Sequence, residues 1–272
     1  MILVIKLLAV DMDGTCLDSE GGMSDKTYNA LKKAAENGIV VVPTTGRNIN
    51  CLPVRIKNDS LYRYVISSNG ALVVDLQENK ELFSAYIDEE TACAILKKLK
   101  KHLILTAIHM NREFYVNGII LYFGVKHVLK SDATSLKISH NLARFVKKNK
   151  ANVEEFQLFY HNEKYRDIIR DIIAPYEEIC VAFSKGYAEL YHRDGTKGTA
   201  LLDLASQLGI SPDEIACIGD EENDISMFKA AGHPYAMGNA IDKIKELAEK
   251  ILPTNDEDGV AFAINEIIGG SL

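Results

Sequence analysis

The stretch Met1-Ile-Leu-Val-Ile-Lys-Leu-Leu-Ala-Val10, followed by Asp11-Met-Asp13-Gly14-Thr15, decides the fold. Apart from Lys6, its first ten residues are apolar and rich in β-branched side chains, which predicts a strand buried on both faces of a parallel sheet. In open α/β sheets, ligands bind beyond the carboxyl ends of the strands. Asp11 and Asp13 fall at that edge, where two neighbouring acids would repel each other without a cation close by. The sequence therefore predicts a charged site directly after the first strand.

The composition is that of a soluble globular protein. The chain has 272 residues, 47% of them hydrophobic and 25% charged, which is enough for one large or two ordinary domains. The net charge of −7 and the pI of about 5.6 argue against binding to nucleic acid or to an anionic membrane. An acidic protein that handles a phosphate needs a local cation, so we expect a metal or a well-placed basic side chain. We expect a monomer or homodimer.

The cysteines favour a reducing compartment. Their number is odd and none is spaced as Cys-x-x-Cys, which argues against a disulfide framework and a zinc site. The first apolar stretch is too short to span a bilayer and lacks the basic leader and cleavage site of a signal peptide. We therefore expect a cytoplasmic location.

Strands and helices alternate in both terminal regions. After the first strand we expect a helix capped by Ser24, a strand at 38–42, a helix over 48–58 and a third sheet strand at 64–67. From residue 197 the alternation resumes; we expect helices at 197–208, 221–231, 241–250 and 260–268 and strands at 214–218, 235–237 and 251–253. This order predicts a doubly wound parallel sheet.

The middle of the chain has a mixed α+β pattern. We expect a hairpin from strands at 71–74 and 82–87, a helix at 88–101, and short strands at 103–109, 112–116 and 119–123, the last two joined by Asn117-Gly118. Helices at 138–149 and 161–174 and strands at 178–183 and 187–191 complete it. We therefore expect an inserted α+β cap at 86–186 and a Rossmann-like core made of 1–85 and 187–272.

Four groups of polar residues fall at predicted strand ends or helix starts. They are Asp11/Asp13, Thr45-Gly46-Arg47, Lys197, and Gly219-Asp220-Glu-Glu-Asn223-Asp224. Each alone has an ordinary explanation: a helix cap, an exposed lysine, or acids in the first turn of a helix. Their common position indicates a shared site.

This set of motifs resembles the four motifs of the haloacid dehalogenase superfamily. More narrowly it is similar to the Cof-type hydrolases, whose large α/β cap is inserted between the second and third motifs. Further Cof-like phrases are Ser-Asn-Gly-Ala at 68–71, Lys-Gly-Thr-Ala-Leu at 197–201 and Met-Gly-Asn-Ala at 237–240. Thr44 departs from the family, which more often has Ala there. The resemblance implies an α/β fold: a Rossmann-like core with a parallel sheet, plus an inserted α+β cap that selects the substrate.

Residue chemistry and the resemblance together assign roles. Asp11 and Asp220 offer hard oxygen ligands to Mg²⁺, and the resemblance adds the backbone carbonyl of Asp13 and places Asp224 at or behind the metal shell. Asp11 would form an aspartyl-phosphate, while Asp13 first protonates the leaving group and then deprotonates water. Lys197 would neutralise negative charge. The expected catalytic residues are Asp11, Asp13, Thr45 and Lys197; the phosphate- or substrate-binding residues are Gly14, Gly46, Arg47, Asn69 and Asn223; the metal ligands are Asp11, Asp13, Asp220 and Asp224.

The expected function is Mg²⁺-dependent hydrolysis of phosphate monoesters of small metabolites, with sugar phosphates as the favoured class. A phosphomutase of the same superfamily and a catalytically silent metal-binding regulatory domain are the alternatives. An EF-hand is excluded because Cys16 and Gly22 stand where its loop from Asp11 needs Gly and Glu. Six cap residues have side chains that could reach a substrate, although packing or surface roles are commoner for each: His109, Arg112, Tyr115, Tyr122, His161 and Lys185.

Overall fold

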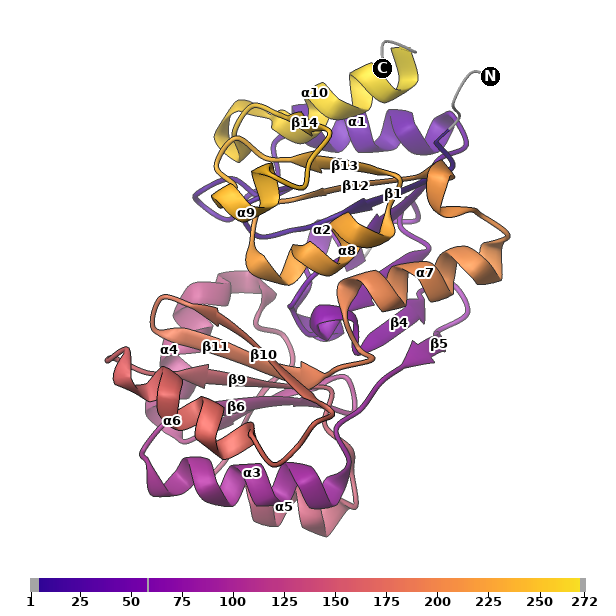
Figure 1. The fold of residues 1–272 in the computed structure, drawn as a ribbon. Helices are drawn as coiled ribbons and strands as arrows, with labels where there is room; N and C mark the ends of the chain where they lie inside the picture. The colour runs from indigo at the N-terminus through magenta and orange to yellow at the C-terminus, as the bar shows by residue number, and fades with distance from the viewer. Residues whose placement is uncertain (1–4, 58, 270–272) are drawn as a thin grey trace. The chain divides into compact units, whose positions relative to one another are not determined.

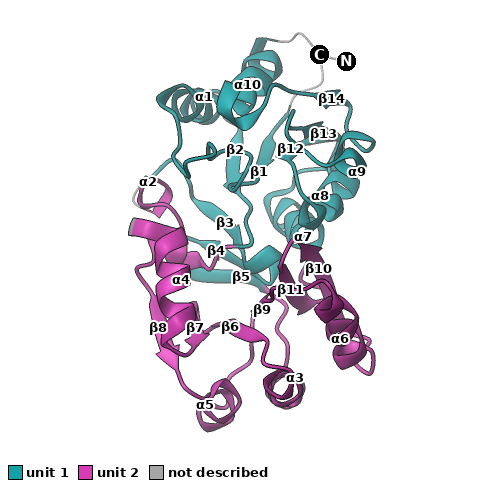
Figure 2. Cartoon of the chain, turned by 90° about the vertical axis from the view of Figure 1, so that its left-hand side faces the viewer, with its two compact units in different colours: residues 1–46, 59–83, 196–272 teal, residues 47–58, 84–195 magenta. Residues whose placement is uncertain are grey.

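The chain divides into two compact units (Figure 2). The computed structural model describes residues 5–57 and 59–269. Unit 1 comprises residues 1–46, 59–83 and 196–272, and unit 2 comprises residues 47–58 and 84–195. Both units mix helices with sheets, and unit 1 contains a parallel sheet, so the α/β fold class predicted from the sequence is confirmed.

The core of unit 1 is a five-stranded parallel sheet in the order β14-β13-β12-β1-β2. Its members are β1 (Leu7–Val10), β2 (Val40–Pro43), β12 (Ile215–Gly219), β13 (His233–Ala236) and β14 (Lys250–Ile251). β1 pairs with β2 on one side and β12 on the other, and all four of its residues are buried. The strand expected from Met1 onward is therefore an interior strand of the sheet, as predicted, although residues 1–4 lie outside the described residues.

Helices cover both faces of this sheet (Figure 1). α1 (Asp25–Glu36) packs against α10 (Gly259–Gly269) on one face, and α7 (Lys197–Leu208) packs against α8 (Ile225–Ala230) on the other. The predicted cap of α1 is confirmed, because Ser24 Oγ accepts a 3.0 Å hydrogen bond from the backbone N–H of Thr27. The helix expected at 241–250 is much shorter in the structure, where α9 covers only Asp242–Lys245.

The strand expected at 64–67 is present with these bounds, but it is not one of the five strands of the parallel sheet. β3 (Tyr64–Ser67) instead belongs to a three-stranded sheet with β4 (Leu72–Asp75) and β5 (Lys80–Ser84). It meets the end of β2 at an isolated parallel bridge between Thr44 and Ile66. Ser68 and Asn69 have positive φ angles, which reverse the chain so that β4 returns antiparallel to β3.

Unit 2 is built on a six-stranded sheet in the order β10-β11-β9-β6-β7-β8. The strands are β6 (Leu105–Met110), β7 (Glu113–Asn117), β8 (Leu136–Ser139), β9 (Glu155–Phe159), β10 (Ile179–Ser184) and β11 (Tyr187–His192). The boundary expected at 186/187 would cut the β10–β11 hairpin. Since β11 hydrogen-bonds to both β9 and β10, the structure keeps the chain in unit 2 until Gly195.

The two faces of this sheet carry different helices. α3 (Glu89–Lys101), α5 (Leu142–Asn149) and α6 (Lys164–Ile173) share one hydrophobic cluster with Ile108 and Met110 of β6. The alternate residue of that strand, Ala107, contacts a second cluster with α4 (Ile119–Leu129). Cys51 joins this second cluster from the segment 47–58, which holds the short helix α2 (Val54–Lys57) in place of the longer helix expected there.

The strand expected at 119–123 is wrong, because α4 occupies this position. Gly118, with a φ of 90°, is the residue before the helix rather than the end of a hairpin turn. Leu121 and Val125, four residues apart, place one helical stripe against the sheet. The first residues of the helix expected at 138–149 also belong to another element, since β8 ends at Ser139 and α5 begins only after the capping residue Asn141. Within the described ranges, no helix combines the length and apolar character that crossing a bilayer requires.

Candidate active site

Asp11 and Asp13 follow β1 in a tight turn of unit 1. The Asp11 backbone N–H donates to the carbonyl of Ile218, which extends the parallel pairing of β1 with β12 by one residue. The Asp11 side chain is buried, whereas Asp13 is exposed. Gly14 has a φ of +81°, and a side chain at this position would collide with the carboxylate of Asp220. The turn therefore separates one buried carboxylate from one that solvent can reach.

Lys197, the first residue of α7, lies between two acids. Its fully buried ammonium donates 2.6 Å hydrogen bonds to Oδ1 of Asp11 and to Oδ1 of Asp224. The helix start is fixed by the side chain of Thr196, which accepts from the backbone N–H of Thr199. Gly70 (φ +102°) also contributes, since a side chain there would overlap the backbone of Thr196 and Lys197. The lysine is thus held at the carboxyl end of the sheet by the backbone around it.

Asp220 and Asp224 enter the site from the loop after β12. Oδ2 of Asp224 accepts hydrogen bonds from the backbone N–H groups of Asp220 (2.8 Å) and Glu221 (3.1 Å). Oδ1 of Asp220 accepts a 2.9 Å hydrogen bond from the hydroxyl of Thr15. Each carboxylate therefore has a fixed orientation.

Burial and mutual repulsion control the ionisation of this cluster. Burial raises the pKa of Asp11 well above its ordinary value; Lys197 opposes this shift, and the neighbouring carboxylates add to it. Burial and the carboxylate of Asp224 raise the pKa of Asp220 to about 7. Burial disfavours the charged form of Lys197, but the two acids it touches outweigh that effect and raise its pKa. Lys197 is therefore charged at neutral pH.

The acids fit a hard divalent cation. Asp11, Asp220 and Asp224 are all buried, and each offers an oxygen within 4.8 Å of the others. Three buried carboxylates face the single positive charge of Lys197, so an added cation would relieve the remaining repulsion. Carboxylate oxygens are the ligands that Mg²⁺ and Ca²⁺ prefer. The cluster can therefore hold a metal ion.

Comparisons with known proteins agree with this geometry. A family model described as haloacid dehalogenase-like hydrolase matches residues 8–264. The chain belongs to this family. It is 31% identical to Phosphatase YwpJ of Bacillus subtilis (strain 168), over 97% of this chain and 100% of that one. It is 28% identical to the 5-amino-6-(5-phospho-D-ribitylamino)uracil phosphatase YwtE of the same organism, over 98% and 99% of the two chains.

A solved structure extends the likeness to three dimensions. A haloacid dehalogenase-like hydrolase from B. subtilis superimposes with a TM-score of 0.87 at 29% identity, covering 96% of this chain and 99% of that one. The family and the phosphatase class of hydrolase predicted from the sequence are therefore confirmed.

Several other predicted site residues of this haloacid dehalogenase-like hydrolase lie in unit 1. The side chain of Thr45 is buried at the end of β2, and its backbone carbonyl accepts a 3.1 Å hydrogen bond from the N–H of Asn69. Asn223 Nδ2 in turn donates a 2.9 Å hydrogen bond to Asn69 Oδ1. The structure thus links three of the expected residues at one sheet edge. Gly46 is the last residue of this stretch of unit 1.

Arg47 is placed differently from the other motif residues. It is the first residue of unit 2, where its guanidinium forms a 2.9 Å ion pair with Asp132. Asp13 was expected to offer its backbone carbonyl to the metal, and this stays a prediction. Among the cap candidates, His109 is fully buried and packs edge-on against Phe114, with ring centroids 4.7 Å apart, so its position is that of a core residue.

Asn239 was missed as a site residue. Its Nδ2 donates to the carbonyl of Gly14 at 2.8 Å and approaches Oδ2 of Asp220 at 3.4 Å, while its Oδ1 accepts from the N–H of Asn255. The sequence carried the signal, since Gly238-Asn239 directly follows the strand predicted at 235–237. Polar residues at the carboxyl end of that strand reach the same sheet edge as Asp11.

Proposed function

We propose that this chain is a Mg²⁺-dependent phosphatase that hydrolyses phosphate monoesters of small metabolites, with sugar and sugar-alcohol phosphates as its substrates. The observation that carries this proposal is the placement of the Lys197 ammonium against both Asp11 and Asp224, beside Asp220. A phosphate monoester is an anion, and a carboxylate nucleophile can approach it only where cations offset the repulsion.

The chemistry begins at Asp11. Lys197 holds Oδ1 of Asp11, which fixes the orientation of the carboxylate. A carboxylate oxygen of Asp11 attacks phosphorus, a new O–P bond forms, and the bond from phosphorus to the ester oxygen breaks. The leaving alkoxide takes a proton from Asp13, the exposed acid of the turn. The product of this half-reaction is an aspartyl-phosphate and a free alcohol.

Water completes the cycle. Asp13, now a carboxylate, takes a proton from water as the water oxygen bonds to phosphorus. The bond from phosphorus to Asp11 breaks, which releases inorganic phosphate and restores the Asp11 carboxylate. Atoms and charges balance, and no redox partner is required.

Asp11, Asp220 and Asp224 would hold the metal. A bound Mg²⁺ would supply a positive charge that draws the phosphate oxygens toward Asp11 and stabilises the charge of the transition state. Thr15 and Asn239 would keep Asp220 in position for it. The hydroxyl of Thr45 and the backbone N–H groups around Gly14 and Gly46 would bind phosphate oxygens.

The substrate class rests on relatives. Three similar B. subtilis proteins are named as phosphatases of 5-amino-6-(5-phospho-D-ribitylamino)uracil, whose phosphate ester sits on a sugar-alcohol chain. Their identities to this chain are 23% to 29%. We therefore place polyol and sugar phosphates first in the panel of test substrates.

The test is phosphate release from a panel of sugar phosphates, ribitol phosphate, nucleotides and pyridoxal phosphate, with Mg²⁺ and then with EDTA. We expect Mg²⁺-dependent release that Asp11→Asn abolishes. The matched control is Asp213→Asn, because Asp213 is an exposed acid of unit 1 that should be dispensable. Release that persists in Asp11→Asn would contradict the proposed nucleophile. Transfer of the phosphoryl group to a second sugar, in place of release, would identify a mutase.

A further inference from the structure

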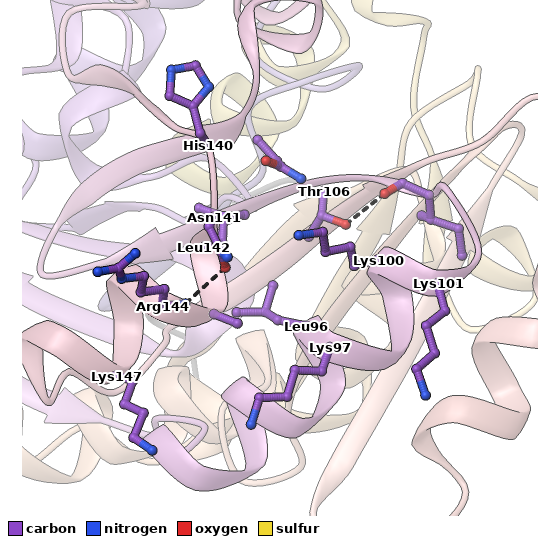
Figure 3. Close-up of a pocket in the computed structure, with 13 residues that line it drawn as sticks. Leu96, Lys97, Lys100, Lys101, Thr106, His140, Asn141, Leu142, Arg144 and Lys147 are labelled. Carbon is purple, nitrogen blue, oxygen red and sulfur yellow. Dashed lines mark hydrogen bonds between the residues drawn. The ribbon is translucent and has the colours of Figure 1, made fainter.

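Unit 2 contains a cavity of about 810 Å³ between α3 and α5 (Figure 3). All its lining residues belong to unit 2, so it shares none with the cluster of Asp11, Asp220 and Asp224. The volume falls in the range of small-molecule sites.

The cavity is strongly cationic. Lys97, Lys100 and Lys101 of α3 and Arg144 and Lys147 of α5 stand at its rim, and all five residues are exposed to solvent. None of the lining residues is acidic, and none of these five cations forms an ion pair with a carboxylate in the described part of the chain. Five exposed positive charges around one pocket, none of them paired with a carboxylate in the described residues, stand out in a chain whose net charge is −7. Such a site attracts polyanions.

The helix ends account for only part of this charge. Lysines in the last turn of α3 are favourable there, because they offset the negative end of the helix dipole. Arg144 lies in the first turn of α5, at the positive end, where a cation is unfavourable and where this helix has no acid. The dipole therefore does not favour a cation at Arg144, and an anion bound beside it would offset this unfavourable interaction.

The floor of the cavity is apolar. Leu96, Ile104 and Leu142 are buried there, and the polar side chains of Thr106 and Asn117 come from neighbouring positions of β6 and β7. A ligand that fits both floor and rim has an apolar or planar body and several negative charges. We propose that this cavity binds a small organic polyphosphate, such as a nucleoside di- or triphosphate. The concave shape and the negative net charge of the chain favour a small molecule over a nucleic acid strand.

The test is calorimetric titration of the full chain, in EDTA, with the non-hydrolysable ATP analogue AMP-PNP. Methylenediphosphonate and adenosine are titrated separately to represent the anionic and the apolar parts. We expect saturable binding of AMP-PNP, weaker binding of methylenediphosphonate, and little binding of adenosine. The double variant Lys100→Ala/Arg144→Ala should weaken AMP-PNP binding at least ~10-fold, since two charge-assisted contacts are lost.

The matched control removes the same charge elsewhere. Lys32 and Lys148 are exposed and do not line the cavity, and Lys148 lies on the same helix as Arg144. Lys32→Ala/Lys148→Ala should bind AMP-PNP like the parent chain. The Arg144→Ala change keeps the backbone N–H that Asn141 caps, so α5 should remain folded, as circular dichroism would verify.

Four results would overturn the proposal. They are the absence of saturable binding, equal weakening in the two double variants, binding of methylenediphosphonate as tight as that of AMP-PNP, and preference for a single-stranded oligonucleotide over AMP-PNP. Phosphatase activity is not a readout here, so failure of this proposal and failure of the proposed catalytic function are independent.

Discussion

The side-chain amide of Asn223 donates a 2.9 Å hydrogen bond to Oδ1 of Asn69, a residue 154 positions away in the sequence. Asn69 has left-handed backbone angles (φ 56°, ψ 19°), which Asn tolerates better than most residues. The bond ties the corner after β3 to the loop that carries Asp220 and Asp224. We expect the pair to stabilise the conformation of this loop.

A double-mutant cycle measures this coupling. Asn69→Ala, Asn223→Ala and the double variant should show an interaction energy of about 0.5–1.5 kcal/mol in urea unfolding, because either single change removes the same hydrogen bond. Asn69→Gly should be milder than Asn69→Ala for stability, because glycine accepts the left-handed backbone. Strictly additive effects of the two single changes would show that the bond contributes nothing.

Lys197 should be needed for stability as well as catalysis. Lys197→Met leaves Asp11 and Asp224 buried without their shared cation, which we expect to lower the free energy of unfolding in EDTA by roughly 3–5 kcal/mol. Asp224→Asn in the same chain should recover part of the loss, since it removes one of the unpaired charges. Lys32→Met, which changes an exposed lysine, serves as the control. An undiminished midpoint of unfolding for Lys197→Met would refute this reading of the cluster.

The affinity of the acid cluster for Mg²⁺ should rise with pH across the range in which Asp220 loses its proton, near pH 7. The pKa of Asp220 lies at about 7 in the metal-free chain, so protons compete with the metal below this pH and cost up to about tenfold in affinity per pH unit. By the same linkage the raised pKa favours the protonated folded form, so Asp220 makes the metal-free chain less stable as pH rises from 3.8 towards 7. Calorimetry of Mg²⁺ binding across this range tests the first point.

Thr15 offers a control for that profile. Its hydroxyl donates to Asp220 and lowers the pKa of this carboxyl, so Thr15→Val should move the rise in Mg²⁺ affinity to higher pH. Thr15→Ser keeps the hydroxyl and should leave the profile in place. If neither substitution changes the pH dependence of Mg²⁺ affinity, a group other than Asp220 is responsible for it.

The stability of the chain should also depend on pH through His109. Burial lowers the pKa of this histidine from 6.5 to about 3. Between these values the unfolded chain binds a proton that the folded chain does not, so the free energy of unfolding falls as pH drops below 6.5, by at most about 1.4 kcal/mol per pH unit. His109→Phe, which keeps an aromatic ring against Phe114, should flatten this slope in thermal unfolding. If the dependence of stability on pH is unchanged, groups other than His109 cause the loss of stability at low pH.

The sequence allowed the acid cluster to be located because one rule applies to every strand of a parallel sheet. Asp11 and Asp220 follow buried strands, so their neighbourhood could be inferred without any structure. Arg47 shows the limit of that rule. Arg47 directly follows Thr45-Gly46 beyond the end of a strand, yet its guanidinium pairs with Asp132. No local sequence pattern indicates an ion-pair partner 85 residues later.

The cap region was harder to predict for a physical reason. Asn117-Gly118 followed by Ile119-Ile-Leu-Tyr-Phe123 suits either a hairpin or a helix start, because short apolar runs do not distinguish the two periods. Packing decides: Leu121 and Val125 bury one helical stripe against β7 and β8 while Ile120 stays exposed. β8 was missed for the related reason that its side chains Lys137 and Ile138 are exposed, which removes the signal of a buried strand.

Unit 2 is encoded by two separate segments, 47–58 and 84–195, and the first of these lies between the second and third strands of unit 1. Cys51 from the short segment packs into the same cluster as α4, and Arg47 and Lys57 bond to residues of the long one. The cap is therefore not a single continuous insertion into the chain. Transferring unit 2 to a relative therefore requires both segments to be exchanged together. Exchanging the long segment alone would pack it against a 47–58 segment from a different sequence.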